Sequence, residues 1–126
     1  MESKAVKITG WVLSGLIALL LMVSATMKLI DWPGKEAEFA KMGFTIAIMF
    51  KIGCLEVVLA LLYLYPKTAF LGAILLTGYL GGASLTHLRV EESMFPPIII
   101  GVLMWVGLGC RMPIIFYLAA GNVTRK

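Results

Sequence analysis

The chain has 126 residues, of which 60% are hydrophobic and 14% are charged, and its mean hydropathy is +0.96. Soluble domains are about 45–50% apolar, so the composition excludes an ordinary soluble domain and leaves no polar segment from which a second domain would form. The net charge of +4 comes from scattered Lys and Arg residues without a clustered basic face, so it does not indicate a nucleic-acid partner.

Long apolar stretches occupy most of the sequence and indicate a membrane protein. A helix needs about 20 mainly apolar residues to cross the hydrocarbon of a bilayer, and four stretches approach or reach that length. Backbone groups in lipid must satisfy their own hydrogen bonds, which favours helices. We therefore predict an all-α, polytopic protein whose residues 1–126 form a single four-helix transmembrane bundle. The expected spans are residues 8–30, 45–65, 68–88 and 97–111.

The first span has an apolar run longer than the roughly 7–15 residues of a signal-peptide core, so we expect an uncleaved first helix. The sequence Asp31-Trp32-Pro33-Gly34 ends it, because proline cannot continue a helix. Trp11 and Trp32, near its two ends, are expected to anchor the helix at the membrane interfaces.

Lys28, close to the end of this span, shares an inward face with Ser24 and Ala25. Two interpretations stay open: Lys28 snorkels to the interface, or it reaches toward Glu56 in the next span. Lys28 and Glu56 are separated in depth by many residues at about 1.5 Å each. A direct pair would therefore require tilt, or a water molecule or ligand between them.

The segment 34–44 is amphipathic. It alternates the charged residues Lys35, Glu36, Glu38 and Lys41 with the apolar residues Ala37, Phe39, Ala40 and Met42. This pattern suits either a short helix that lies on the membrane surface or a plain polar loop. In the predicted fold it is the short interfacial helix that follows the first span.

Glu56 lies near the middle of the second span, where an unpaired carboxylate costs several kcal/mol. Helical spacing puts Gly53, Ala60 and Tyr63 on its face, a strip that suits close packing on another helix. We expect Glu56 to face the interior of the bundle. It is either a ligand-binding or proton-handling carboxyl, or a structural hydrogen-bonding group that fixes helix packing.

The third span follows the second after a turn at residues 66–67, so the two spans should be antiparallel neighbours. Gly78 and Gly82 form a GxxxG ridge, which predicts tight contact with a neighbouring helix. Tyr79 shares the face of Gly82 at about mid-membrane depth.

Haem and metal sites are not indicated by the ligating residues of the chain. His87 is a lone histidine near the end of the third span, so no second histidine completes a bis-His haem site. It either forms an interfacial hydrogen bond or takes part in proton or ligand chemistry. Cys54 and Cys110 lie within apolar spans and form no CxxC motif, so we expect two small buried residues and no metal site.

The fourth span begins near Pro97, since proline is tolerated in a first helical turn. Trp105 has Gly101 and Gly109 at four-residue spacing, and it either fills a packing notch or forms the wall of a pocket for a flat ligand. We expect the span to stop near Arg111, with the guanidinium snorkelling to the headgroups and residues 114–119 at the interface.

Together these spans predict a cavity. The antiparallel order places Glu56, Tyr79 and Trp105 near mid-membrane. It places Lys28, His87 and Arg89 at the mouth on the outer side, where we expect them to attract an anionic or carbonyl-bearing ligand.

The distribution of basic residues predicts the orientation. One side of the membrane would hold Lys4, Lys7, Lys67, Arg111, Arg125 and Lys126. The other side would hold Lys28, Lys35, Lys41 and Arg89, with most of the acids. The first side is expected to be cytoplasmic, with both termini inside.

Several of these motifs, in order along the chain, resemble the DoxX-like family of small bacterial membrane proteins. The run from Gly78 to Val90, GYLGGASLTHLRV, resembles the third-helix signature of that family, and IGCLE at 52–56 resembles its second-helix Gly-x-x-Glu motif. Lys28-Leu29 matches the end of its first helix, and WVGL at 105–108 its fourth. Two departures are Ala25, where the family often has glycine, and a tail after Arg111 without the usual arginine-rich pattern.

The resemblance implies a four-helix bundle in the bacterial cytoplasmic membrane. The wider group includes a subunit associated with thiosulfate:quinone oxidoreduction and members linked to redox-stress complexes. We therefore expect an accessory subunit of a quinone-linked redox system, incomplete as an enzyme alone, with quinone as the implied cofactor and a protein partner or a second copy. The alternative is a non-enzymatic assembly factor, or a protein that binds a lipid or small molecule.

Overall fold

A computed structural model describes residues 3–122, and every regular element in that range is a helix. The elements are α1 (Lys4–Leu29), α2 (Lys35–Lys41), α3 (Ile46–Leu64), α4 (Ala69–Arg89), α5 (Phe95–Arg111) and α6 (Ile114–Ala119). This confirms the predicted all-α fold, with a short helix after the first span. Arg125 and Lys126, on which the predicted orientation partly depends, lie outside the described residues.

Polar side chains set the starts of two long helices. The Ser3 hydroxyl accepts a hydrogen bond from the Val6 amide at the start of α1, and the Thr45 hydroxyl accepts one from the Ile48 amide at the start of α3. Such N-caps satisfy amides that have no partner inside the helix. Gly34 has a φ of 83°, a left-handed conformation that suits glycine, and it lets the chain turn from α1 into α2.

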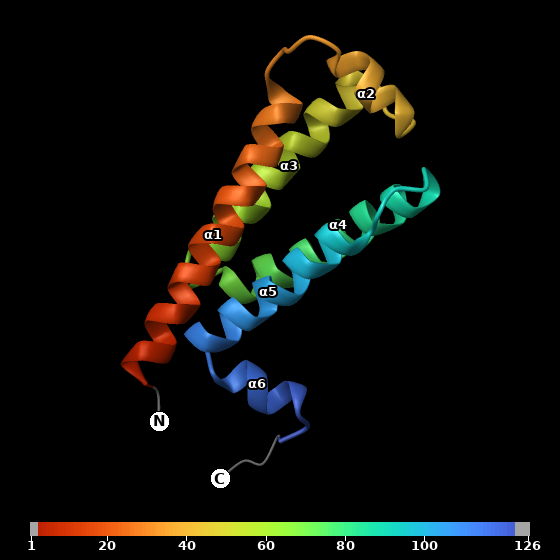
Figure 1. The fold of residues 1–126 in the computed structure, drawn as a ribbon. Helices are drawn as coiled ribbons and strands as arrows, with labels where there is room; N and C mark the ends of the chain where they lie inside the picture. Colours follow the sequence, from red (N-terminus) through yellow and green to blue (C-terminus); the bar gives the residue numbers. More distant parts are fainter. Residues whose placement is uncertain (1–2, 123–126) are drawn as a thin grey trace.

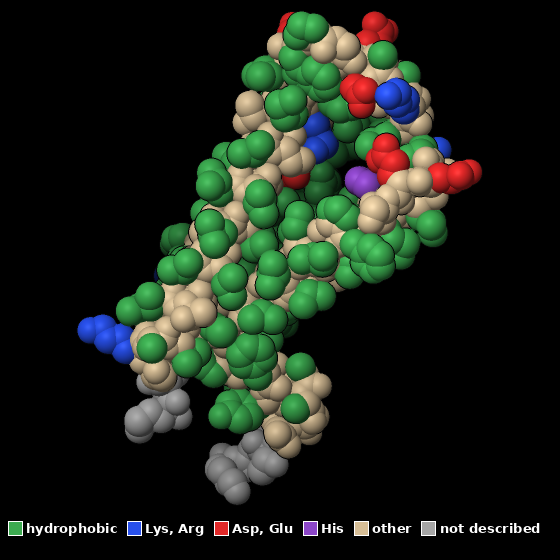
Figure 2. Space-filling view, in the orientation of Figure 1, with side chains coloured by type: hydrophobic (Ala, Val, Ile, Leu, Met, Phe, Trp, Pro, Cys, Tyr) green, Lys and Arg blue, Asp and Glu red, His purple; other side chains and the backbone are tan. Residues whose placement is uncertain are grey.

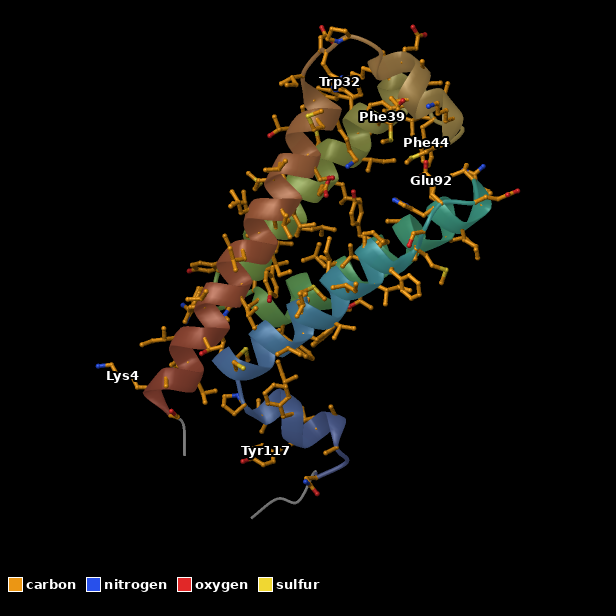
Figure 3. All side chains as sticks on the ribbon, in the orientation of Figure 1. Lys4, Trp32, Phe39, Phe44, Glu92 and Tyr117 are labelled. Atoms are coloured by element: carbon orange, nitrogen blue, oxygen red, sulfur yellow. The ribbon has the colours of Figure 1, made fainter. Side chains whose placement is uncertain are left out.

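The long helices form two pairs, α1 with α3 and α4 with α5. The pairs diverge toward one end of the molecule (Figure 1). Helix α1 packs against α3 and α5, and α4 packs against α3 and α5, so α1 and α4 are diagonal to each other. Figure 3 labels Lys4 and Tyr117 at one end of the molecule, here named the closed end. Trp32, Phe39, Phe44 and Glu92 lie at the other, here named the open end, where the pairs are far apart (Figure 3).

The hydrophobic core includes side chains from every long helix, such as Ile17, Tyr63, Leu76 and Met104, all at most 2% exposed. The backbones approach closely where α3 meets α4. A Cβ placed on Gly72 would lie 2.6 Å from the Tyr63 nitrogen, so only glycine allows this approach of the two backbones.

The predicted glycine ridge on the third span does not have this role, and that prediction was wrong. A Cβ on Gly78 or Gly82 would meet nothing within 4 Å. Helix α4 makes its close contacts through the small residues of its first turns instead. Gly78 and Gly82 lie in the part of α4 that has diverged from the α1–α3 pair, and they line the space between the pairs.

The outer surface is apolar, as a bilayer requires. Leu and Ile side chains are exposed along all of the long helices, and green hydrophobic atoms cover much of the visible face (Figure 2). Three helices, α1, α3 and α4, are long and apolar enough to cross a membrane, and α5 is a shorter apolar helix of 17 residues. The chain is therefore a helical membrane protein.

Helix α2 covers the open end, and the helical interpretation of segment 34–44 was the correct one. Phe39 of α2 is buried and meets the Trp32 ring edge-on, with 6.0 Å between centroids. Lys35 is also buried and donates to the Ile30 carbonyl at 2.6 Å. At the closed end, α6 is separate from α5, as expected for residues 114–119.

Candidate functional site

The divergence of the two helix pairs creates a cavity of about 580 Å³ at the open end. Figure 2 shows it as a hollow in which a basic side chain, an acidic side chain and the single histidine are visible. Apolar side chains from α1 to α5 form most of the wall. The polar side chains that line it are Ser24, Lys28, Glu56, Tyr79, Thr86 and His87.

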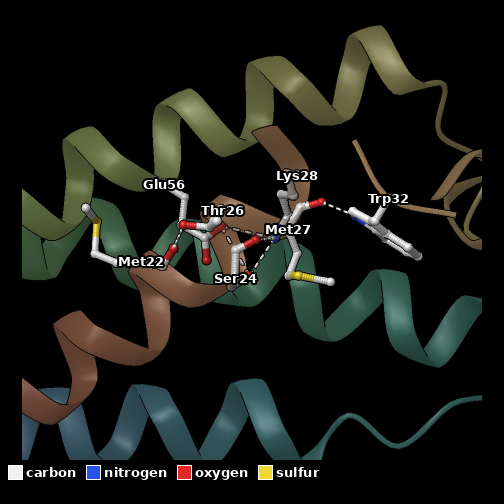
Figure 4. A network of polar contacts seen from close by, with 7 residues as sticks. All are labelled: Met22, Ser24, Thr26, Met27, Lys28, Trp32 and Glu56. Carbon is white, nitrogen blue, oxygen red and sulfur yellow. Dashed lines mark hydrogen bonds and ion pairs between the residues drawn. The ribbon is translucent and has the colours of Figure 1, made fainter. Parts of the chain in front are cut away.

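The polar end of the cavity is organised by a direct ion pair between α1 and α3 (Figure 4). Lys28 Nζ lies 3.0 Å from Glu56 Oε1, and the two side chains are 13% and 2% exposed. The Ser24 hydroxyl donates to the same Oε1 at 3.2 Å. Glu56 therefore faces the interior, paired with a cation.

The expected separation of Lys28 and Glu56 in depth was wrong. A Cβ on Gly53 would lie 2.9 Å from Lys28 Cβ, so Gly53 and Lys28 are at the same level. Glu56 is only three residues deeper, about 4.5 Å along a helix. The helix α3 begins beyond the end of α1, beneath α2, and counting residues from the two helix ends could not reveal that offset.

Lys28 uses all of its hydrogens within the protein. Its ammonium group donates to the Ser24 carbonyl at 3.4 Å, to the Ser24 hydroxyl at 2.6 Å and to Glu56 Oε1 at 3.0 Å. An ammonium group has three hydrogens to donate. Snorkelling to the interface therefore does not describe this lysine.

Tyr79 and His87 line the wall that α4 contributes. Tyr79 lines the same cavity as Glu56. His87 Nδ1 lies 2.8 Å from the Ala83 carbonyl oxygen, one turn earlier in α4. These two residues and the ion pair bring four of the six predicted site residues to one cavity.

The other two predicted residues lie elsewhere. Arg89 does not line the cavity; its Nη2 donates to the Met42 carbonyl at 2.5 Å and links the end of α4 to the end of α2 beside the mouth. Trp105 borders a separate hollow of about 530 Å³ on the α4–α5 side. Its Nε1 donates to Thr77 at 2.7 Å, and Phe70 packs edge-on against its ring.

Sequence reasoning missed a polar network at the closed end. Arg111 was expected to snorkel outward, but it is 5% exposed and turns inward. Its Nη1 donates to Ser14 at 3.1 Å and to the Tyr63 carbonyl at 3.0 Å, and Nη2 donates to the Leu64 carbonyl at 3.2 Å. Trp11 stacks on the guanidinium at 3.9 Å.

This network explains how the buried cation is tolerated although no carboxylate within residues 3–122 forms an ion pair with it. Tyr63 and Leu64 end α3, and carbonyls at a helix C-terminus lack partners inside the helix and carry partial negative charge. Arg111 satisfies them and joins α5 to α3. One feature of the sequence indicated this network, namely Ser14 on the inward face of an apolar span. The sequence alone did not identify Arg111 as its partner.

The two cysteines are not both buried, so that expectation was wrong for Cys54. It is exposed on α3, and Cys110 is partly buried. Cys54 stands two residues from Glu56, and residues two apart do not share a helix face. The inward direction of Glu56 therefore turns Cys54 outward.

Comparison with known protein families matches residues 12–107 to the DoxX-like family. No curated protein and no solved structure matches the chain. The matched range includes every residue that lines the cavity and ends before Arg111.

Proposed function

Because this chain belongs to the DoxX-like family, we propose that it binds a small amphiphile of the quinone class and serves as an accessory subunit of a quinone-linked membrane redox system. The observation that carries the proposal is the cavity between the helix pairs. It combines apolar walls with the polar side chains of Lys28, Glu56 and His87.

The dimensions and lining of the cavity suit such a ligand. Small-molecule sites are commonly about 300–1,000 Å³, mostly apolar, with a few placed polar groups, and the volume here is about 580 Å³. A quinone ring would occupy the polar part near Glu56, and its isoprenoid tail would lie along apolar residues such as Leu20 and Leu55. In an accessory subunit these residues bind and orient the ligand, and a partner protein carries out the electron transfer.

The alternative is a non-enzymatic assembly factor or lipid-binding protein. One observation favours it: the charges of Lys28 and Glu56 are already paired within the chain, so the polar group is stable without a ligand. The walls would also accept an acyl chain. Identification of the bound molecule separates the two functions, since only the first requires a quinone.

The location proposed is the bacterial cytoplasmic membrane, crossed several times, with both termini on the cytoplasmic side. Support comes from Lys4 and Tyr117, which lie at the same end of the molecule (Figure 3). The acids Glu36, Glu38 and Glu92 belong to α2 and to the α4–α5 loop at the opposite end. The orientation itself follows from the exposed basic residues, with Lys4, Lys7 and Lys67 at the first end against Lys41 and Arg89 at the other, in agreement with the excess of basic residues usual for cytoplasmic loops.

Two glycines of α4 provide a matched test. Gly82 lines the cavity and Gly81 borders the other hollow, and a side chain on either would meet nothing within 4 Å. G82L should therefore fill the cavity, and G81L should add the same side chain outside it. Both should fold, since leucine is a better helix former than glycine.

The measurement is mass spectrometry of lipids extracted from protein purified in a mild detergent. We expect a quinone with the wild-type protein and with G81L, and little with G82L. Equal amounts of quinone with G81L and G82L would refute binding in the cavity. A lipid other than quinone, retained by G81L and lost from G82L, would establish the alternative function.

A further inference from the structure

The geometry points to a preference for the reduced, dihydroxy form of the ligand: the cavity should bind a quinol more tightly than the corresponding quinone. This inference rests on the proposed function and specifies its ligand. It follows from the hydrogens of the polar side chains that line the cavity. Except for Tyr79, each of these side chains that has a hydrogen to donate already donates it within the protein.

Lys28 and Ser24 are fully committed as donors. The three hydrogens of Lys28 Nζ go to the carbonyl and hydroxyl oxygens of Ser24 and to Glu56 Oε1. The single hydroxyl hydrogen of Ser24 goes to Glu56 Oε1 as well. A carbonyl oxygen of a ligand would have to displace one of these bonds to gain a donor.

Thr86 has also used its hydroxyl hydrogen. Thr86 donates to the Gly82 carbonyl at 2.9 Å. Tyr79 lines the same cavity as Glu56, and its hydroxyl can donate to a ligand or accept from one. Each hydroxyl oxygen keeps lone pairs that accept.

His87 supplies an acceptor through its tautomer. Its Nδ1 lies 2.8 Å from the Ala83 carbonyl oxygen, which accepts and cannot donate, so the proton is on Nδ1. In the neutral imidazole the other nitrogen, Nε2, then carries a lone pair. The histidine therefore offers the cavity an acceptor.

Glu56 has acceptor capacity left. Ser24 and Lys28 both bind Oε1, and a carboxylate has about four acceptor sites over its two oxygens. Glu56 on α3 and His87 on α4 thus border one cavity as acceptors from two helices. A ligand with two hydroxyl groups can donate to both, whereas a quinone, whose ring oxygens only accept, can donate to neither.

The test compares three probes that share one ring. Duroquinol donates two hydrogen bonds, duroquinone donates none, and the dimethyl ether of duroquinol keeps the oxidation state of the quinol but has no hydroxyl hydrogen. Dissociation constants are measured by calorimetry under anaerobic conditions with wild-type protein in nanodiscs. We expect duroquinol to bind about 10-fold or more tightly than either other probe.

Two variants locate the preference. H87F removes the acceptor on α4 and keeps a ring, so it should reduce the difference between duroquinol and duroquinone. W105F alters a side chain outside the cavity and should leave the difference unchanged. If H87F does not fold, the three probes on the wild-type protein still decide the outcome.

The results separate the two proposals. Binding of duroquinone as tightly as duroquinol, or more tightly, would overturn the preference and leave quinone binding in place. Binding of the dimethyl ether as tightly as duroquinol would overturn the role of the hydroxyl hydrogens. Failure of all three probes to bind would overturn both the preference and the proposed function.

Discussion

Replacement of Lys28 by methionine tests whether the ion pair stabilises the membrane fold. Methionine keeps the length and apolar character of the lysine stem and removes the charge. It would leave Glu56, which is 2% exposed, without the ammonium group 3.0 Å away. The Ser24 hydroxyl would still donate a hydrogen bond to Oε1.

Two effects set the magnitude. Hydrogen bonds between membrane helices are worth about 0.6 kcal/mol on average, so the lost bonds are the smaller effect. An uncompensated charge at the centre of a membrane helix costs about 2.5–3.5 kcal/mol, similar to the roughly 3–5 kcal/mol lost when one partner of a buried pair is removed. The charge therefore dominates, and we expect K28M to lose about 3 kcal/mol of stability.

The control is the double variant K28M/E56Q, in which neither residue is charged. The amide introduced by E56Q can still form a hydrogen bond with Ser24, so the double variant should recover most of the stability that K28M loses. Unfolding in a mild detergent, followed by circular dichroism, compares the wild-type protein with both variants. The reasoning is refuted if K28M is as stable as the wild-type protein, or if the double variant is no more stable than K28M.

Three further predictions concern the closed end, the α3–α4 contact and the orientation. R111K keeps the charge but cannot reproduce the planar guanidinium that binds Ser14 and the carbonyls at the end of α3. It should therefore lower the free energy of unfolding by about 1–2 kcal/mol in the same assay. An unchanged unfolding midpoint would contradict the role assigned to Arg111. G72V should prevent folding, because its Cβ would lie 2.6 Å from the Tyr63 nitrogen; a monodisperse, wild-type-like elution profile would show that the contact can relax. Single cysteines are introduced at position 122 or position 38 of a cysteine-free variant and labelled with an impermeant maleimide. The two positions should react from opposite sides of the membrane, position 122 from the cytoplasm. External labelling of position 122 would reverse the proposed orientation.

The helices were predictable because each rests on a local property. The apolar runs are long enough to identify membrane-spanning helices from their length alone. Pro33 and Pro113 mark helix ends, because proline interrupts a helix whatever the rest of the chain does. The inward direction of Glu56 was predictable for a similar reason, since the cost of exposing it to lipid does not depend on the identity of its neighbours.

The predictions that were wrong depended on how the helices are placed relative to one another. The Lys28–Glu56 contact requires α3 to extend beyond α1, and the open surroundings of Gly78 require α4 to diverge from α1 and α3. Arg111 has the sequence pattern of a snorkelling residue, and only its position beside the end of α3 makes an inward direction favourable. Helical periodicity assigns a face to a residue but does not say which helix, cavity or lipid that face meets.

The closed end and the open end differ in the contacts that hold their helices together. At the closed end, Arg111 and Tyr63 connect several helices with buried hydrogen bonds, and side chains fill the space between them. At the open end, the Arg89–Met42 bond links α4 to α2 across an exposed region. Local opening is easiest where backbone and side-chain contacts are few and reached by solvent. Separation of α2 from α4 would therefore widen the open end while the Lys28–Glu56 pair and the closed end stay in place.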